Sequence, residues 1–327
     1  KKMLITKTPY RISFFGGGTD YPEWYQKHGG SFLSTTIDKY VYLTVRQLPS
    51  FSDSNYRIVW SKVETVNKIS EIQHNVVREM LNNYKFKTGM EVHYQGDLPA
   101  RSGMGSSSSF VVGLMNSFIN IKKKNISKKN LAKKSIYFEQ KTLKEVVGLQ
   151  DQISATYGGF NKVDINQKGE FRIKKIKITN KIKEFNKNLF LIFTGINRTA
   201  NEIAGQYVND LKKKESEMKE IFSQVKEGEN LLLKNKFDDF GRLLHEGWKL
   251  KKRLGKVITN QKIDNLYNMS LRHGALGGKI LGAGGGGFML LYIPRDKIKN
   301  FKKKIGKLTI IPFNFSEKGS EILLNTE

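Results

Sequence analysis

Residues 97–110, DLPARSGMGSSSSF, have the composition of a phosphate-binding loop. Gly103 and Gly105 allow the main chain to approach a ligand closely, and the four serines that follow supply N–H groups and hydroxyls where a helix begins. The Gly-Lys-Ser/Thr ending of the common phosphate loop is missing, so we expect a cradle of another type. The alternative is a flexible linker, which is disfavoured because the stretch lies between a predicted strand and a strongly apolar helix.

A second glycine cluster, GAGGGG at residues 282–287, formally matches the GxGxxG pattern of dinucleotide-binding loops. That fold needs a helix after the loop, whereas the residues that follow, FMLLYIP, are typical of a strand. Two interpretations stay open: a turn that serves packing only, or a loop that approaches another segment or a ligand closely. The entropy cost of adjacent glycines favours the second.

A third cluster, GGGTD at residues 16–20, displays the carboxylate of Asp20 at the end of a predicted strand. In that strand apolar residues alternate with Arg11 and Ser13, which places Arg11 on the face away from the core. The alternative for Asp20 is a tight turn in which its carboxylate only caps main-chain donors.

Two further carboxylates lie on predicted helices. In the helix over 148–159, Leu149 and Ile153 belong to one apolar stripe, and Asp151 lies about 200° around the helix from Leu149, so it faces away from the core. Glu139 lies in a helix predicted over 130–147, where the many lysines leave open that it is only a solvated ion-pair partner.

The elements that position these residues alternate between strands and helices without internal repeats. Strands are predicted over 8–15, 40–48, 57–63, 89–96, 188–193 and 288–294, and helices over 71–84, 110–121, 130–147 and 148–159. The character changes near residues 183–188, where a continuous apolar strand leads toward two long charged helices. We therefore predict two domains, residues 1–185 and 186–327.

The composition is that of a globular protein with a strongly basic charge. Of 327 residues 38% are hydrophobic, and the formal net charge is +27. The charge comes from 46 lysines and only 11 arginines, which are scattered and form no Arg-rich stripe with stacking aromatics. Solvated helix faces explain this pattern best, and a basic nucleic-acid-binding protein is kept as an alternative of a different class.

Absent residue types limit the possible metal sites. The chain has no cysteine, and its five histidines form no HExxH pair, so any metal must be held by oxygen, which favours Mg²⁺. No apolar run approaches about 18 residues, and the opening KKMLITKTPYR lacks the apolar centre of a signal peptide. We expect a soluble cytoplasmic protein.

Together the three glycine motifs resemble those of GHMP kinases, a small-molecule kinase family that includes galactokinase, homoserine kinase, mevalonate kinase and phosphomevalonate kinase. TPYRISFFGGGTDYP, LPARSGMGSSSSF and KILGAGGGGF occur in the family's order and span essentially the whole chain. The resemblance implies a two-domain α+β fold, with a ribosomal-protein-S5-like N-terminal α/β domain, a ferredoxin-like C-terminal domain and the active site in the cleft between them.

One departure narrows this resemblance. Galactokinases carry Gly-Glu-His-Thr-Asp in the first motif, where this chain has Gly-Gly-Gly-Thr-Asp at 16–20. Residues 11–45 are similar instead to D-glycero-D-manno-heptose 7-phosphate kinases of bacterial surface-polysaccharide synthesis. That likeness implies ATP-dependent phosphorylation of the anomeric C1 hydroxyl, giving heptose 1,7-bisphosphate on the route to GDP-heptose. Another GHMP sugar 1-kinase, of the fucose or galactose type, is the nearest alternative.

The resemblance also implies roles for individual residues. Asp151 would accept the proton of the sugar hydroxyl, with Arg11 beside it to stabilise the moving phosphoryl group; the alternative is a surface Arg–Asp ion pair. The residues expected to bind the sugar are Asp20, Gly17 and Gly18. Those expected to bind ATP are Gly103, Gly105, Ser106, Ser107, Ser108, Gly284 and Gly285. Mg²⁺ would be held by Ser106 or Ser107 and by Glu139.

A phosphate already present on the substrate needs cations of its own. Arg101, Arg198 and Lys39 are candidates because they lie near the motifs in the sequence. The expected partners are a small-molecule sugar phosphate and ATP, without nucleic acid or membrane, and the expected state is a monomer or homodimer. A binding protein without catalysis is disfavoured because Arg11, Asp151 and the serine loop are all present.

Overall fold

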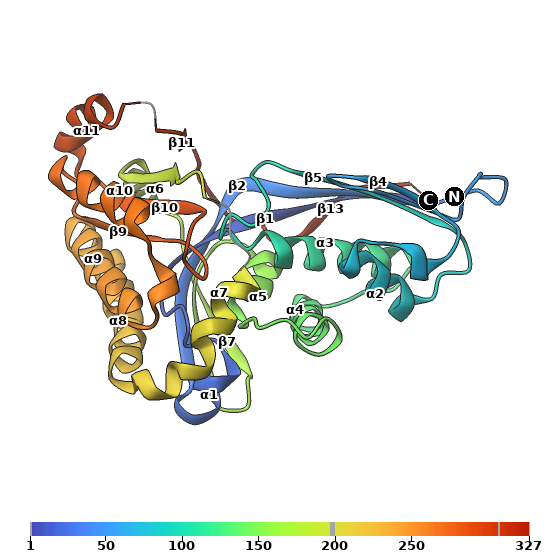
Figure 1. Ribbon diagram of the computed structural model, residues 1–327, viewed down its shortest axis with the longest axis horizontal. Helices are drawn as coiled ribbons and strands as arrows, with labels where there is room; N and C mark the ends of the chain where they lie inside the picture. Colours follow the sequence, from blue (N-terminus) through green and yellow to red (C-terminus); the bar gives the residue numbers. More distant parts are fainter. Residues whose placement is uncertain (1, 197–199, 307, 327) are drawn as a thin grey trace.

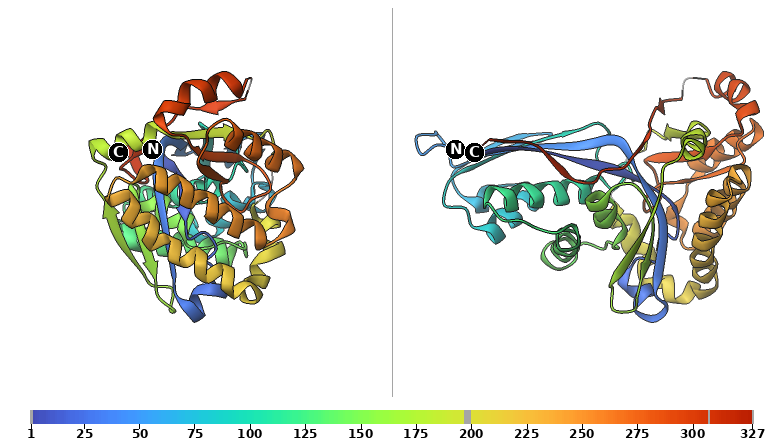
Figure 2. Two further views of the ribbon diagram at one scale, coloured as in Figure 1. Left: turned by 90° about the vertical axis from the view of Figure 1, so that its left-hand side faces the viewer. Right: turned by 180° about the vertical axis from the view of Figure 1, so that it is seen from behind.

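The computed structural model describes residues 2–196, 200–306 and 308–326, which form an elongated molecule of two lobes (Figure 1). The first lobe is a long twisted sheet with helices against one face, and the second is a smaller sheet with its own helices (Figures 1 and 2). At the far end of the first lobe Met3 is paired with Thr326 (Figure 1). Both ends of the described chain therefore belong to one sheet.

The first sheet has nine strands: β1 (Met3–Phe15), β2 (Gly30–Gln47), β3 (Tyr56–Val59), β4 (Val63–Val66), β5 (Met90–Gly96), β6 (Phe160–Ile165), β7 (Phe171–Ile176), β12 (Phe315–Ser316) and β13 (Glu321–Thr326). Their order is β13-β1-β2-β5-β3-β4, with β12 and β6 also paired to β2 and β7 paired to β6. β1 and β2 are the longest and pair antiparallel, so a single ribbon runs through the first lobe toward the second (Figure 1).

The side-chain alternation of β1 turns Arg11 away from the core. Tyr10 and Ile12 are fully buried in the main hydrophobic cluster. Arg11 and Ser13 point to the opposite face, where both bond to a helix described below. The predicted strand and its two faces are confirmed.

The strand predicted over residues 57–63 is wrong, because the chain turns within it. β3 ends at Val59, and β4 returns antiparallel from Val63. The Trp60 N–H donates to the Lys62 carbonyl (2.8 Å), and the indole N–H donates to Glu64 (2.8 Å). These two bonds close the turn, which brings the Trp60 ring to the cavity described below.

The helices of the first lobe, counted with the short turns that accompany them, are α1 (Pro22–His28), η1 (Ile69–Glu71), α2 (Asn75–Tyr84), α3 (Ser106–Ile121), α4 (Lys128–Tyr137), η2 (Phe138–Thr142) and α5 (Gln150–Tyr157). The single helix predicted over 130–147 is wrong: α4 passes into the π-helical turn η2, and Lys144 takes a left-handed φ of 56° that a helix cannot continue through. The residues up to 149 are therefore a connection that leads into α5.

The second lobe has four strands: β8 (Leu189–Phe193), β9 (Gly277–Ile280), β10 (Phe288–Tyr292) and β11 (Ile310–Ile311). Its helices and short turns, with the preceding α6, are α6 (Asn180–Lys187), α7 (Ala200–Tyr207), η3 (Val208–Lys214), α8 (Glu215–Leu233), α9 (Phe237–Arg253), η4 (Lys256–Ile258), α10 (Gln261–Arg272), η5 (Arg295–Lys297) and α11 (Ile298–Lys304). The strand order β11-β8-β10-β9, with antiparallel neighbours and helices between β8 and β9 and between β10 and β11, is ferredoxin-like, as expected.

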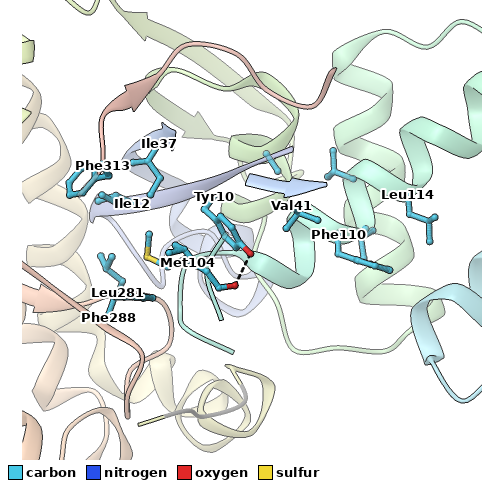
Figure 3. Close-up of a cluster of buried hydrophobic side chains, with 14 of the residues drawn as sticks. Tyr10, Ile12, Ile37, Val41, Met104, Phe110, Leu114, Leu281, Phe288 and Phe313 are labelled. Carbon is cyan, nitrogen blue, oxygen red and sulfur yellow. Dashed lines mark hydrogen bonds between the residues drawn. The ribbon is translucent and has the colours of Figure 1, made fainter. Parts of the chain in front are cut away.

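A shared core joins the two lobes. Figure 3 shows Met104, at the middle of the serine loop, between Ile12 of β1 and the second-lobe residues Leu281 and Phe288, all of them in one buried cluster. Main-chain hydrogen bonds tie the loop to both lobes. The Arg11 N–H donates to the Met104 carbonyl (3.1 Å), and the Phe288 N–H donates to the Ser102 carbonyl (3.2 Å). The loop is thus clamped between the lobes.

The chain returns to the first sheet after completing the second lobe, because β12 pairs with β2 and β13 with β1. The boundary at 185/186 stays a prediction, and the first sheet contains strands from both sides of it. Across the described residues, helices long and apolar enough to cross a membrane are absent.

Candidate active site

A cavity of about 700 Å³ lies where the two lobes meet, and all three glycine motifs contribute to its wall. From the motifs the lining includes Gly17, Gly18, Gly103, Gly105, Gly282, Gly284 and Gly286. Three loops that are far apart in the sequence therefore meet at one site, in the cleft that the sequence led us to expect.

Arg11 and Asp151 form a bidentate ion pair on the cavity wall. Arg11 Nε donates to one carboxylate oxygen of Asp151 (2.7 Å) and Nη2 to the other (2.9 Å). The remaining Nη1 donates to the carbonyl of Gly103 (2.6 Å), which ties the pair to the serine loop. Because the Arg11 side chain is only 6% exposed and that of Asp151 is 30% exposed, the carboxylate is the partner that faces the cavity.

Asp20 is a buried carboxylate at the edge of the same cavity. It accepts hydrogen bonds from the main-chain N–H groups of Gln150 (3.0 Å) and Gly18 (3.2 Å). Burial raises the pKa of Asp20 to about 6, and the negative charge of Asp151 adds to this shift. A Cβ on Gly148 would lie 2.0 Å from the Asp20 carboxylate, so only glycine fits there.

Glu139 is fully buried in the π-helical turn η2, which excludes a solvated partner for surface lysines. The Ser108 hydroxyl lies 3.0 Å from each of its carboxylate oxygens, and the Gln152 side-chain amide also donates to it. Burial raises the pKa of Glu139 to about 8, and the negative charges of Glu145 and Asp151 add to this shift. Ser106 and Ser107 line the cavity beside this pair.

These residues fit a divalent cation. The donors are a carboxyl group and hydroxyls, the hard oxygens that Mg²⁺ prefers, and the buried Glu139 has no salt-bridge partner among the described side chains, so a cation there would favour its charged form. Among the residues that the structure describes, groups of three or more His, Cys, Asp and Glu able to hold a metal are absent. One carboxylate with phosphate oxygens and water is the usual way Mg²⁺ is bound at phosphoryl-transfer sites.

The glycines of the second cluster allow two loops to touch. A Cβ on Gly103 would lie 2.5 Å from the Leu281 carbonyl, and one on Gly282 would lie 2.7 Å from the Gly103 Cα. Both residues also have a left-handed φ, 77° and 69°. Of the two interpretations left open for GAGGGG, close approach to another segment is the one observed.

An apolar group of side chains lines another part of the cavity. The ring centroids of Trp60 and His74 are 4.9 Å apart, those of His74 and Phe110 are 4.9 Å apart, and those of Tyr94 and Phe110 are 5.6 Å apart. Since α3 begins at Ser106, Phe110 lies about one helical turn into it, which places this aromatic group next to the serine loop.

Two lysines of the second lobe also line the cavity, and the sequence analysis missed them. Lys251 on α9 and Lys279 on β9 are 8% and 7% exposed. Lys279 Nζ donates to the Phe14 carbonyl (3.0 Å), and Lys251 Nζ donates to the Gly282 carbonyl. Burial lowers the pKa of Lys279 to about 7 and that of Lys251 well below its usual value.

The remaining sequence-predicted residues lie in different places. Arg101 is exposed and lines the cavity, whereas Lys39 pairs with Asp38 (3.6 Å) and is outside the lining. Gly285 packs against second-lobe residues, with Ile203 2.9 Å from where its Cβ would be. Arg198 lies outside the described residues.

Comparisons with known proteins identify the class. The family model described as GHMP kinases N terminal domain matches residues 67–159, and the model described as GHMP kinases C terminal matches residues 229–308. Together the two matches cover more than half of the chain. The first match contains the serine loop, Glu139 and Asp151, and the second contains both buried lysines. The chain belongs to the GHMP kinase family.

Individual relatives extend over more of the chain. The D-glycero-alpha-D-manno-heptose 7-phosphate kinase of Campylobacter jejuni is 27% identical over 97% of this chain and 98% of its own length. The mevalonate kinase of Methanocaldococcus jannaschii is 29% identical over 71% of this chain and 70% of its own. A crystal structure of a D-glycero-D-manno-heptose 1-phosphate kinase from Bacteroides thetaiotaomicron has a TM-score of 0.80 over 98% of this chain and 99% of that chain, at 22% identity, and so supports the fold.

The protein is therefore a kinase, and the family's phosphoryl donor is ATP. This confirms the predicted fold class and enzyme class. Because the relatives include kinases named for different acceptors, the acceptor has to be argued from this site.

Proposed function

We propose that the protein transfers the γ-phosphoryl group of ATP to the anomeric hydroxyl of D-glycero-D-manno-heptose 7-phosphate. The observation that carries this proposal is the Arg11–Asp151 pair, which stands in one cavity with the serine loop and the buried Asp20. The relative from Campylobacter jejuni, similar over nearly the whole chain, supports the choice of sugar.

The nucleotide fits the side of the cavity formed by α3. Main-chain N–H groups at the start of α3, after Gly103 and Gly105, suit the phosphates, and the loop serines add hydroxyls. The aromatic group of Trp60, His74 and Phe110 suits the base, since flat π systems stack on one another. Gly284 lines the cavity from the second lobe, where it would lie opposite the phosphates.

Mg²⁺ would be held by Glu139 and by a serine hydroxyl of the loop. Among the loop serines, Ser108 is the one whose hydroxyl contacts the Glu139 carboxylate. When bound, the ion neutralises charge on the phosphate oxygens during transfer. The π-helical turn η2 sets the position of Glu139, and Gln152 fixes its carboxylate from the α5 side.

Asp151 and Arg11 supply the chemistry at the acceptor. As the anomeric oxygen forms a bond to the γ-phosphorus and the bond to the β-phosphate oxygen breaks, the hydroxyl proton passes to Asp151 and ADP leaves. The bidentate contact with Arg11 holds the Asp151 carboxylate in one orientation, and its guanidinium charge stabilises the phosphoryl group in transit. Asp20, Gly17 and Gly18 orient the sugar hydroxyls.

A substrate panel tests this function. Purified protein with ATP and Mg²⁺ is assayed for ADP release on free and phosphorylated heptose, mannose, fucose and galactose, and the product is identified by phosphorus NMR. We expect preferred turnover of D-glycero-D-manno-heptose 7-phosphate with a new anomeric phosphate. Turnover confined to fucose or galactose would reject the heptose and leave a GHMP sugar 1-kinase of another type.

A further inference from the structure

Lys251 and Lys279 are buried lysines that the chemistry above does not use. Each reaches only main-chain carbonyls, those of Gly282 and Ile280 for Lys251 and that of Phe14 for Lys279. No carboxylate among the described side chains forms a salt bridge with either lysine. The two ammonium groups also act on each other, and the guanidinium of Arg11 adds a third positive charge.

Such an arrangement costs stability in the empty protein. A buried ammonium loses its hydration, and neighbouring positive charges increase the cost unless an anion compensates for it. Both lysines line the cavity, so an anion in the cavity can reach them. Two buried lysines on one cavity wall, without carboxylate partners in the described structure, are therefore best explained by a ligand that brings two negative charges and restores their charged form.

Their position indicates which ligand. Lys279 contacts the carbonyl of Phe14, just before the glycine turn of Gly17 and Gly18, and Lys251 is within electrostatic range of Asp20. This is the side proposed for the sugar. The ATP phosphates have their cradle at the start of α3. Lys251 borders that cradle, because Gly282, whose carbonyl it binds, approaches Gly103, and it is the Phe14 contact of Lys279 that places the pair toward the sugar.

We propose that Lys251 and Lys279 bind the phosphate ester that the sugar carries before the reaction, and that they select phosphorylated over unphosphorylated sugars. The inference rests on the proposed function and adds residues from the second lobe to it. They differ from Arg101, Arg198 and Lys39, which were chosen from the sequence for the same task.

The test compares two acceptors on three variants: Lys251→Met, Lys279→Met and the double substitution. Methionine keeps the length and burial of the side chain and removes the charge. We expect the KM for heptose 7-phosphate to rise about 10- to 100-fold in each single variant, as for loss of a hydrogen bond to a charged group. The KM for unphosphorylated heptose and the kcat for both acceptors should stay within about 3-fold.

Lys249→Met is the matched control, because Lys249 is on the same helix, is half-exposed and pairs with Glu246 at 3.0 Å. Thermal unfolding without ligand gives an independent result. If the lysines serve a ligand, the methionine variants should unfold at the same or a higher temperature, since an apolar side chain of similar length replaces a buried polar group. A lower unfolding temperature with unchanged selectivity would mean that the lysines are structural, and would reject the site.

Other outcomes separate this inference from the proposed function. An equal fall of kcat for both acceptors would mean that the lysines stabilise the transferred phosphoryl group, and would overturn the inference. If the wild type turns over no phosphorylated heptose, the proposed function fails. Binding of heptose 7-phosphate without ATP, measured by calorimetry, then still tests the lysine site. Binding that is lost in the double variant but kept in the wild type and in Lys249→Met supports the site, and equal binding by all three proteins rejects it.

Discussion

The two sides of the cavity bind anions by different physical means. On the first-lobe side the serine loop offers N–H groups and hydroxyls, which carry no net charge, beside a buried acid, Glu139. On the second-lobe side Lys251 and Lys279 are buried without a salt-bridge partner among the described side chains, and burial lowers the pKa of both. Neutral donors are held in position at little cost, whereas the charged form of a buried lysine is unfavourable in the empty protein and gains most when an anion binds beside it.

Substitution in the Arg11–Asp151 ion pair should give the largest effect on activity. Asp151→Asn keeps the size of the side chain but removes the proton acceptor, so kcat should fall about 10³-fold while the KM of both substrates changes little. Asp239→Asn, at an exposed position on α9, is the control and should retain full activity. Steady-state kinetics measure both. A loss of less than about 10-fold in Asp151→Asn would remove Asp151 as the base.

Glu139→Gln should affect the first-lobe side alone. Because Glu139 is the buried carboxylate of the proposed Mg²⁺ site, we expect kcat to fall at least about 10-fold and the Mg²⁺ concentration for half-maximal rate to rise. Heptose 7-phosphate binding measured without ATP should be unchanged. If sugar binding weakens as much as the Mg²⁺ dependence, the two sides are not independent and the comparison fails.

Acidification should weaken the sugar side through Asp20. The charged and titratable groups that interact with it are Asp151, Lys251, Tyr21, Tyr25 and Tyr207. Since the pKa of Asp20 is raised to about 6, its carboxylate is protonated below that pH, and the KM for the sugar should rise up to about tenfold per pH unit.

The same shift has a consequence for stability. The folded protein keeps a proton on Asp20 that the unfolded chain releases near pH 3.8, so the free energy of unfolding should decrease as the pH rises from 3.8 to about 6. Asp20→Asn should make this decrease smaller, which chemical denaturation at several pH values would reveal; the part that stays is expected from Glu139, whose pKa is also raised, to about 8. An unchanged pH slope in Asp20→Asn would assign the decrease to another group.

Gly282→Ala tests the contact between the two glycine loops. Its Cβ would lie 2.7 Å from the Gly103 Cα, so the loops must separate, at a cost of about 1–3 kcal/mol in the free energy of unfolding. We expect the KM for ATP to rise several-fold. Gly306→Ala is matched in backbone, since its φ is also positive at 61°, and nothing lies within 4 Å of its Cβ. Equal effects of the two variants would show backbone strain alone and no role for the contact.

The sequence was sufficient for features that repeat locally. Adjacent glycines and serines mark the serine loop, and a two-residue alternation is enough to turn Arg11 away from the core. Helical spacing gave the outward face of Asp151. That the two meet as an ion pair came only from the resemblance, because a helix and a strand 140 positions apart share no local signal.

The features that were missed depend on contacts between distant elements. Lys251 is one of several lysines near the end of α9, but it continues the apolar stripe of Leu244 and Trp248 at helical spacing. That signal was overlooked because the lysine runs were interpreted as solvated helix faces. Lys279 had a weak signal, since it is a lone charge in the run GGKILG. The π-helical turn that positions Glu139, and the contact of Ser108 with it, depend on packing between α3, α4 and α5.

The smallest expected effect contrasts two surface cations with the buried pair. Lys39 is outside the cavity lining and its charge is offset by Asp38, so Lys39→Met should change the KM for heptose 7-phosphate less than about 2-fold. Arg101 is exposed on the lining, where water and salt screen its charge, so Arg101→Met should raise that KM only about 2- to 5-fold and less in high salt. Kinetics at two salt concentrations measure this. If Arg101→Met raises the KM for heptose 7-phosphate more than Lys251→Met or Lys279→Met does, then the sugar phosphate is recognised at the exposed rim of the cavity. Burial would then not be what makes the second-lobe side selective.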